Sequence, residues 1–268
     1  MRSYRATHIA LGAVLAALPF MIGCYVNTNT GGCSSGDYRA KAERTEDLTT
    51  PAGDIAGINI AIDVGAIHLK AADTDEVRVA AEITVKAKTV EEAEDLVERM
   101  HVRTRRSGRN LVIEAVKPSD FGRNQLAVNF TITAPRDLAL QCTTDVGDIR
   151  ITDFTRRIEA RTDVGKILCT ALRDEADLHA NVGDIRATYA GDAPARLSVA
   201  ATTNVGNIDF TGPSEISARL SASTNVGSIN TDRPLTVSGH VKNAINATLG
   251  QAQGNITLKT NVGSISIR

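Results

Sequence analysis

The sequence predicts an all-β fold: a single-stranded, right-handed parallel β-solenoid (β-helix) with an N-terminal strand–helix–strand insertion or cap. Three observations predict it. A five-residue phrase recurs along the chain, and apolar residues alternate with period two on both sides of each copy. Helical periodicity is convincing in only one segment. A strand repeat of about 20 residues is typical of a solenoid, in which each unit buries its apolar stripe by stacking on its neighbours.

The recurring phrase reads Asp or Asn, then Val, Gly, any residue and Ile. The acidic or amide positions are Asp63, Asp145, Asp163, Asn181, Asn204, Asn225 and Asn261, and the glycines are Gly65, Gly147, Gly165, Gly183, Gly206, Gly227 and Gly263. Gly permits a positive-φ corner, while Asp or Asn can bond the backbone across a turn and Asn can stack into a ladder. We expect these residues to form structural corners, with Val and Ile flanking each corner and filling the core.

The spacing of the glycines defines the rungs of the predicted array, which spans residues 138–268. The spacing is 18 from 147 to 165 and from 165 to 183, then 23, then 21. From 227 to 263 it is 36, twice 18, which predicts a degenerate rung near Ile245. The chain given stops at Arg268 directly after a rung, so we expect an open C-terminal strand edge there.

Residues 73–137 interrupt the repeat and are expected to close the N-terminal side of the array. Period-two alternation predicts a strand over Glu76–Ala87. A helix is expected over Thr89–Met100, with Thr89 capping it and Glu92 at capping-box spacing. Two more strands, Leu111–Val116 and Leu126–Thr133, and a loop over 134–137 complete a module that hides unpaired strand edges.

The N-terminus has the features of a targeting segment. Arg2 and Arg5 precede an apolar run, Ile9–Ile22, which is too short to span a bilayer comfortably and suits a signal peptide. Residues 1–23 are therefore expected to be a lipoprotein-type signal peptide, because Met21-Ile22-Gly23-Cys24 resembles a lipobox. Cys24 is then the lipid-attachment residue, followed by a flexible tether over 24–53. An ordinary signal peptide with a free Cys24 is the alternative, and Cys33 is a weaker lipidation candidate.

Composition limits the function. Net charge is −1 and aromatic residues make up 3% of the chain, without Trp. These values argue against nucleic acid as a partner and against a carbohydrate-stacking groove. The five histidines are scattered without ligand spacing, so no metal and no cofactor are expected. The Asp column at 63, 145 and 163 suits hydrogen-bonded corners better than a calcium or general-acid site, because Asn replaces Asp in later copies.

Cys142 and Cys169 both fall on inward columns of the repeat, but on different columns and different rungs. We expect them to be buried thiols that pack as small hydrophobic side chains. A disulfide, which exported chains often form, is the alternative.

The repeated Val-Gly-x-Ile phrase, the strand–helix insertion and the lipoprotein leader together resemble the "putative adhesin" family of bacterial envelope proteins over residues 54–268. That family carries Gly-Asp-Ile-type repeats and resembles the head domains of autotransporter adhesins. The resemblance implies a β-helical, non-catalytic surface domain, and it supplies no site residue to transfer.

The resulting hypothesis is a non-catalytic, lipid-anchored protein of the bacterial cell envelope, at the outer membrane or cell surface rather than the inner membrane. Its expected partners are the membrane, through the lipid anchor, and an envelope protein or surface glycan, with self-association through the C-terminal solenoid edge. Two alternatives stay open: a carbohydrate-active β-helix enzyme that uses exposed carboxylates, and an envelope assembly or stress module that binds protein through its edge.

Overall fold

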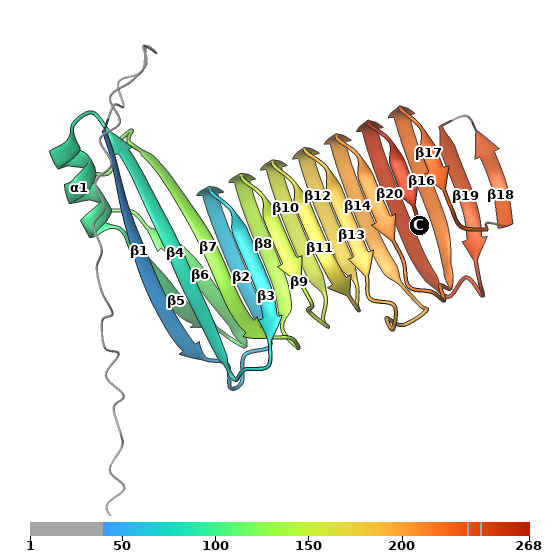
Figure 1. The fold of residues 1–268 in the computed structure, drawn as a ribbon, viewed down its shortest axis with the longest axis horizontal. Coiled ribbons are helices and arrows are strands. Elements are labelled where there is room, and N and C mark those ends of the chain that lie inside the picture. The colour runs from blue at the N-terminus through green and yellow to red at the C-terminus, as the bar shows by residue number, and fades with distance from the viewer. Residues whose placement is uncertain (1–39, 235, 242) are drawn as a thin grey trace, which may run out of the picture.

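The computed structural model describes residues 40–268 with the exception of positions 235 and 242. The described chain is all-β apart from one short helix, and it forms two long sheets that face one another (Figure 1). Each repeat supplies one strand to each sheet, and the phrase with its glycine forms the corner between them. The predicted all-β architecture with parallel sheets is therefore confirmed.

The ten-stranded sheet holds the strand that follows each corner. Its strands, in spatial order, are β1 (Ala40–Pro51), β4 (Glu76–Ala87), β7 (Gln125–Pro135), β3 (Ile67–Ala72), β9 (Ile149–Thr152), β11 (Ile167–Leu172), β13 (Ile185–Tyr189), β15 (Ile208–Thr211), β21 (Ile265–Ile267) and β17 (Ile229–Thr231). From β7 to β17 neighbouring strands are parallel, whereas β1, β4 and β7 pair antiparallel.

The eleven-stranded sheet holds the strand that precedes each corner. Its strands, in spatial order, are β18 (Thr236–Val241), β19 (Ala244–Leu249), β16 (Ala218–Val226), β20 (Gly254–Val262), β14 (Ser198–Val205), β12 (Ala176–Val182), β10 (Ile158–Val164), β8 (Ala139–Val146), β2 (Gly57–Val64), β6 (Asn110–Val116) and β5 (His101–Ser107). Residues at equivalent template positions are Cα partners, as Val164 is with Val146 and Val182.

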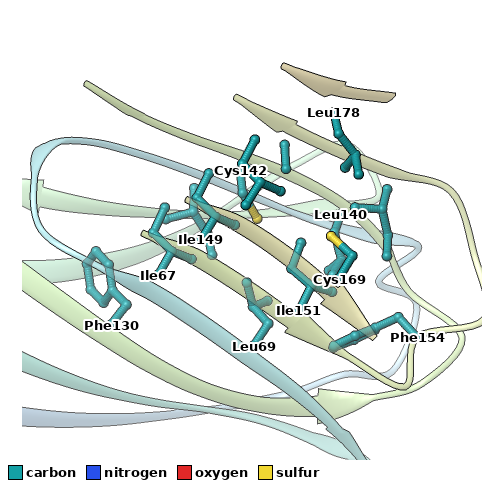
Figure 2. Packing of buried hydrophobic residues seen from close by; sticks show 14 of the residues in the cluster. Ile67, Leu69, Phe130, Leu140, Cys142, Ile149, Ile151, Phe154, Cys169 and Leu178 are labelled. Atoms are coloured by element: carbon teal, nitrogen blue, oxygen red, sulfur yellow. The ribbon is translucent and has the colours of Figure 1, made fainter. Parts of the chain in front are cut away.

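The core lies between the two sheets and consists of short aliphatic side chains. Ile149 and Ile151 enter it from β9, and Leu140 and Cys142 enter it from β8 (Figure 2). Because each inward column repeats from rung to rung, an aliphatic side chain stacks on its equivalent one strand away. Phe154 fills the space beside the end of β9 and is fully buried.

The helix α1 (Val90–Arg99) and its flanking strands form the end of the molecule opposite the last rungs (Figure 1). The Thr89 hydroxyl accepts a hydrogen bond from the amide of Glu92 at 3.2 Å, as the capping-box spacing predicts. Ala93, Leu96 and Val97 are the buried face of the helix. The strand predicted over 76–87 has those bounds in the structure, and β7 continues through Pro135, where a loop was predicted.

The structure also corrects the expectations for the tether and for the C-terminal end of the array. The tether predicted over 24–53 is structured from Ala40 to Pro51, which forms the edge strand β1 paired antiparallel with β4 along its whole length. Only alternate residues at its start are buried, so its polar composition suits an edge strand. The part of the tether before residue 40 lies outside the described residues, as does the signal peptide.

No degenerate rung forms near Ile245. Strands β18 and β19 instead form an antiparallel hairpin, and β19 pairs with β16. The last rung, β20–β21, lies between β14–β15 and β16–β17 rather than at the end of the array. The C-terminal strand β21 is therefore an interior strand, so the open C-terminal edge expected from the sequence does not exist, and the edge strands at that end are β17 and β18.

Candidate functional site: a ladder of seven corners

The seven corner glycines share one backbone geometry that only Gly accommodates. Their φ angles lie between +137° at Gly65 and +153° at Gly147 and Gly165. A Cβ added at Gly183 would lie 1.7 Å from the carbonyl oxygen of Gly165, and the other corner glycines in the array have equivalent clashes. Both the positive φ and the close approach of the neighbouring rung therefore require Gly.

Buried threonine hydroxyls bond the corner carbonyls. Thr162 donates to the carbonyl oxygen of Gly147 at 3.0 Å, and Thr203 donates to that of Gly183 at 3.0 Å. Equivalent bonds start at Thr144, Thr224 and Thr260. At the corresponding position of two rungs Ile62 and Ala180 replace Thr. This pattern explains why a hydroxyl occupies an otherwise apolar inward column, because a buried carbonyl needs a donor.

The Asp or Asn column divides the ladder into two regions. In spatial order the first three rungs carry Asp63, Asp145 and Asp163, and the last four carry Asn181, Asn204, Asn261 and Asn225. The four amides are hydrogen-bonded in series: Asn204 donates to Asn181 at 2.6 Å, Asn261 to Asn204 at 2.9 Å and Asn225 to Asn261 at 3.2 Å. Carboxylates have no donor to repeat this series; Asp63 instead contacts Lys117.

At four corners the side chain that follows the glycine accepts a hydrogen bond from a backbone amide of the next rung. Asp148 accepts from the amide of Lys166 at 2.9 Å, and Asp184 accepts from that of Asn207 at 3.0 Å. Asn207 in turn accepts from the amide of Ser264. These side chains satisfy amides that face solvent at the corner, a role that the sequence pattern alone did not reveal.

The expectation that the corner valines fill the core is wrong. All seven are between 41% and 63% exposed, and they are the large hydrophobic side chains that the described chain exposes: Val64, Val146, Val164, Val182, Val205, Val226 and Val262. The alternation of buried and exposed residues in β8 was expected to continue through Val146, but it ends at the buried Thr144. Asp145 and Val146 therefore both face solvent. The isoleucine on the other side of the corner does enter the core, as Ile149 shows.

We call this column of exposed valines the valine row. Its members are Cα partners from rung to rung, so the row is continuous along one edge of the molecule. The Asp and Asn side chains flank it. A continuous apolar stripe on a protein surface commonly marks an interaction site, so the valine row is the candidate contact surface of the ladder.

A charged hollow of about 300 Å³ lies beside the ladder on the outer face of the ten-stranded sheet. Its charged lining consists of three acids and three bases: Asp148, Asp184, Asp209, Arg150, Lys166 and Arg186. They pair with one another, with Arg186 and Asp209 closest at 3.1 Å. Asp148 and Asp184 are also the corner side chains that bond backbone amides, so their carboxylates are held by the scaffold.

A second hollow, of about 590 Å³, lies where β6 leaves β2 near the first corner. The pairing of β2 with β6 covers only Gly57–Ile60, and β2 continues to Val64 beyond it. Lys86, Lys117, Asp63 and Phe121 are among the residues that line this hollow. Sequence reasoning missed both hollows, because each depends on which segments lie side by side.

The two predicted buried cysteines are free thiols in the structure, on β8 and β11 (Figure 2). Burial raises the pKa of the Cys169 thiol to about 12 and raises the pKa of Cys142 further, so both stay protonated and pack as small apolar side chains. Within residues 40–268, apart from 235 and 242, no group of three or more His, Cys, Asp or Glu side chains is arranged to hold a metal ion. In the same residues no helix is long and apolar enough to cross a membrane.

The fold and its edge define a class of protein, a stacked parallel-β scaffold that presents the same side chains rung after rung. Residues 34–268 match the family described as Toastrack DUF4097, and the chain belongs to that family. Among curated proteins the comparison found no match.

Three of the solved structures to which the chain is similar come from bacteria. A "putative cell adhesion protein" from Clostridium sporogenes is 12% identical, with a TM-score of 0.45 over 84% of this chain and 98% of that one. A "putative adhesin" from Bacteroides fragilis is 17% identical, with a TM-score of 0.40 over 84% and 97%. A "putative adhesin" from Parabacteroides distasonis is 11% identical, with a TM-score of 0.29 over 84% and 97%.

Proposed function

We propose that this chain is a non-catalytic, adhesin-like scaffold of the bacterial cell envelope that binds another envelope protein along the valine row. The observation that carries the proposal is the exposure of all seven corner valines in one continuous column. Nothing in the corner geometry requires Val at this position, since its side chain contributes little to the core. An exposed apolar stripe lowers solubility unless a partner covers it.

The chemistry of the edge favours a protein partner over a glycan. Carbohydrate grooves rely on aromatic faces, and the valine row is flanked by amides and carboxylates instead. Exposed amides and short aliphatic side chains in a regular series suit an extended polypeptide, which offers alternating apolar side chains and backbone hydrogen-bonding groups.

The binding proposal is tested with a triple variant, V146T/V164T/V182T, which keeps the side-chain shape while making the middle of the row polar. We expect binding to isolated bacterial envelopes to weaken by roughly tenfold, as about 1.4 kcal/mol of lost apolar contact would produce. A matched control, Q141A/E159A/D177A, changes outward residues on the same three rungs and should bind like the wild type. Equal binding by all three proteins would refute the proposal.

We propose further that a lipid on Cys24 holds the scaffold to the membrane after removal of residues 1–23. The support is the charged and apolar leader ending in Met21-Ile22-Gly23-Cys24. The variant C24A, or treatment with a signal-peptidase II inhibitor, should move the protein from the membrane fraction to the soluble fraction. The matched variant C33A should remain membrane-bound, and unchanged fractionation of C24A would disprove the anchor.

We also infer that the array winds as a right-handed solenoid and that the N-terminal module caps it. Connections between parallel strands of one sheet are right-handed in nearly all proteins, which supports the handedness. Beside the module the ten-stranded sheet ends in the edge strand β1, which carries five charged residues between Lys41 and Asp47, as protected sheet edges do. An experimental structure would test the handedness. Association of a chain with E43V and E46V in β1, but not of the wild type, would support the cap.

A carbohydrate-active enzyme is the second candidate function. A glycosidase needs two carboxylates that flank the scissile bond, and Asp148 and Asp184 line the charged hollow beside the ladder. Both carboxylates also accept backbone hydrogen bonds at the corners, which supports a structural role and places the enzyme second. Release of reducing ends from envelope glycans by the wild type, lost in D148N/D184N and kept in the surface variant D177N, would establish the enzyme over the scaffold.

A further inference from the structure

The final rung of the array lies inside the structure although it comes last in the sequence. β20 is parallel to β14 on one side and to β16 on the other, and β21 lies in the same way between β15 and β17. Figure 1 shows β20 between β14 and β16, while β18 and β19 lie beyond β16. Along the sequence, β16–β17 and the hairpin β18–β19 come first. The rung β20–β21 follows them but lies between β14–β15 and β16–β17.

The two strands that β20 separates are already joined at their beginning. Arg196 and Ser217 form a parallel β-bridge, and the amide of Ser217 donates to the carbonyl oxygen of Ala195 at 2.7 Å. One residue later β20 enters between them. We call this place the strand fork. The offset of the bridge, 21 residues, equals the offset between Gly206 and Gly227, so the strands at the fork are in register for direct stacking of β16 on β14.

The two rungs that could stack on β14–β15 carry the same corner. Residues 224–229 and 260–265 both read Thr-Asn-Val-Gly-Ser-Ile. Thr260 donates to the carbonyl oxygen of Gly206 and Asn261 donates to Asn204. Thr224 and Asn225 make the same two bonds to the inserted rung. For each corner bond that β20 donates to the rung of β14, β16 therefore carries the equivalent donor, Thr224 or Asn225, which could make the same bond if β16 paired directly with β14.

The entry of the inserted rung is specific. At Gly254 a Cβ would lie 2.0 Å from the carbonyl oxygen of Leu197, so the fork admits Gly alone at this point. The amide of Asn255 donates to Leu197, and the hydroxyl of Ser217 accepts from the amides of Gln251 and Gln253. The fork thus holds the start of β20 through defined bonds rather than through general packing.

The balance between an inserted and an ejected rung depends on apolar burial. Ile256, Leu258, Ile265 and Ile267 are fully buried when the rung is inserted. An ejected rung would expose all four, while β14 and β16 could pair directly and leave no open edge at the fork. An exposed amphipathic strand pair needs an equivalent acceptor, and the strand fork of a second copy of this chain is identical to its own.

We propose that the strand fork is an exchange site, at which β20–β21 of one copy inserts between β14–β15 and β16–β17 of another. The occupant is the C-terminal strand pair of a second copy, because its Gly254, its Thr-Asn-Val-Gly-Ser-Ile corner and its four buried aliphatic residues match the fork. The result is a strand-exchanged dimer in which each fork keeps the strand pairing and the corner bonds of the monomer, while the turn at 250–253 between β19 and β20 opens. This inference does not depend on what binds the valine row.

Two full-length variants, each with one added cysteine, test the exchange. Ser221 on β16 and Thr257 on β20 are Cα partners with outward side chains. Neighbouring strands of a sheet lie about 4.8 Å apart, within disulfide reach. S221C and T257C proteins are mixed, warmed below the unfolding temperature and oxidised, and disulfide-linked dimers are measured. The control mixture is D177C with A200C, which are partners on β12 and β14 away from the fork.

We expect linked dimers in the first mixture and only collisional background in the second. The double variant S221C/T257C, oxidised before warming, should stay monomeric in light scattering, whereas the wild type gives a roughly twofold larger mass on warming. Equal dimer yields in both mixtures would mean random collision and would overturn the proposal. An absence of linked dimers in the first mixture would overturn it as well, since the other cysteines of the chain are common to both mixtures.

Discussion

The ladder of corners contains two regions with the same backbone and different side-chain chemistry. The rungs that carry Asp63, Asp145 and Asp163 stack like charges one strand apart, whereas the rungs from Asn181 to Asn225 link their amides in series. The glycine conformations are almost identical in both regions. The comparison teaches that the corner is set by glycine and its backbone bonds, and that the Asp or Asn side chain adjusts the stability of a corner that exists already.

The outer face does not follow the same division. The charged hollow takes Asp148, Arg150 and Lys166 from Asp-rich rungs and Asp184, Arg186 and Asp209 from Asn-rich rungs, so the difference between the regions lies in the corner column alone. Like charges on directly opposed positions of a sheet are destabilising, while paired amides stabilise. The Asn-rich region should therefore be the more robust half of the ladder, and salt should narrow the difference by screening the exposed carboxylates.

The largest expected effect removes the feature that both regions share. In Gly165→Ala and Gly206→Ala, the new Cβ would lie 2.0 Å from the neighbouring carbonyl oxygen at φ near +153°. We expect each variant to lose about 3–5 kcal/mol of unfolding free energy in chemical denaturation. Gly108→Ala is the matched control, because its φ is +61° but no atom lies within 4 Å, and it should lose about 1 kcal/mol.

A larger loss at one glycine corner than at the other would break the comparison, since it would show that the backbone geometry of the two regions is not equivalent in energy.

The second effect removes a hydroxyl bond in each region. Thr162→Val and Thr203→Val leave the carbonyl oxygens of Gly147 and Gly183 without the donor they have at 3.0 Å. Each variant should lose about 1–2 kcal/mol, because a buried acceptor is left unpaired. Thermal unfolding monitored by circular dichroism would measure the loss. The outward Thr143→Val is the control and should change stability little, and a similar loss in all three would contradict the role of the buried hydroxyl.

The third effect exchanges the chemistry of the two regions. Asn204→Asp removes the donor to Asn181, while its carboxylate can still accept from Asn261, and it should cost about 1 kcal/mol. Asp145→Asn removes a charge between Asp63 and Asp163 and should stabilise by about 0.5 kcal/mol. Both changes should shrink in high salt to the extent that they arise from charge repulsion. Destabilisation by Asp145→Asn at low salt would refute the proposed difference between the two regions.

The smallest effect concerns acid. Arg103 lowers the pKa of Glu114 through a hydrogen bond, with Arg105 adding to it, and Arg99 lowers the pKa of Asp120. A carboxyl with a lowered pKa in the folded state contributes stability above its unfolded pKa and loses it as the pH falls through the folded value. Both groups lie in the N-terminal module, so acid should loosen β5–β6 before the array.

Amide hydrogen exchange between pH 7 and pH 3 would show this order of opening. Glu114→Gln should make exchange in β5–β6 less dependent on pH, and the exposed Glu98→Gln should leave it unchanged. Earlier opening of the array in acid would contradict the prediction.

Local features of this fold were predictable from the sequence because they depend on neighbouring residues. Period-two alternation located β4 with its observed bounds, and the spacing of Thr89 and Glu92 located the start of α1. The recurring glycines located all seven corners. The direction of the corner valines was not predictable, because the alternation could shift phase on either side of the corner and both choices leave the pattern equally regular.

The spatial order of the last two rungs could not be predicted, because their corner sequences are the same. Residues 224–229 and 260–265 are identical, so no local rule says which of the two stacks on β14–β15. The hairpin β18–β19 decides it by occupying the outer edge of β16. The strand β1 was missed for a similar reason, since its polar sequence becomes a strand only through pairing with β4.

The valine row has a consequence for how tightly a partner must fit. Its seven members repeat at one strand spacing, about 4.8 Å, and each offers the same contact. A partner that covers four valines would have four equivalent positions along the row, which adds RT ln 4, about 0.8 kcal/mol, to its binding free energy through multiplicity alone. Such a partner could shift by one rung without losing contact. The complex would then tolerate displacement of the partner along the row, because each shift by one rung restores the same contacts.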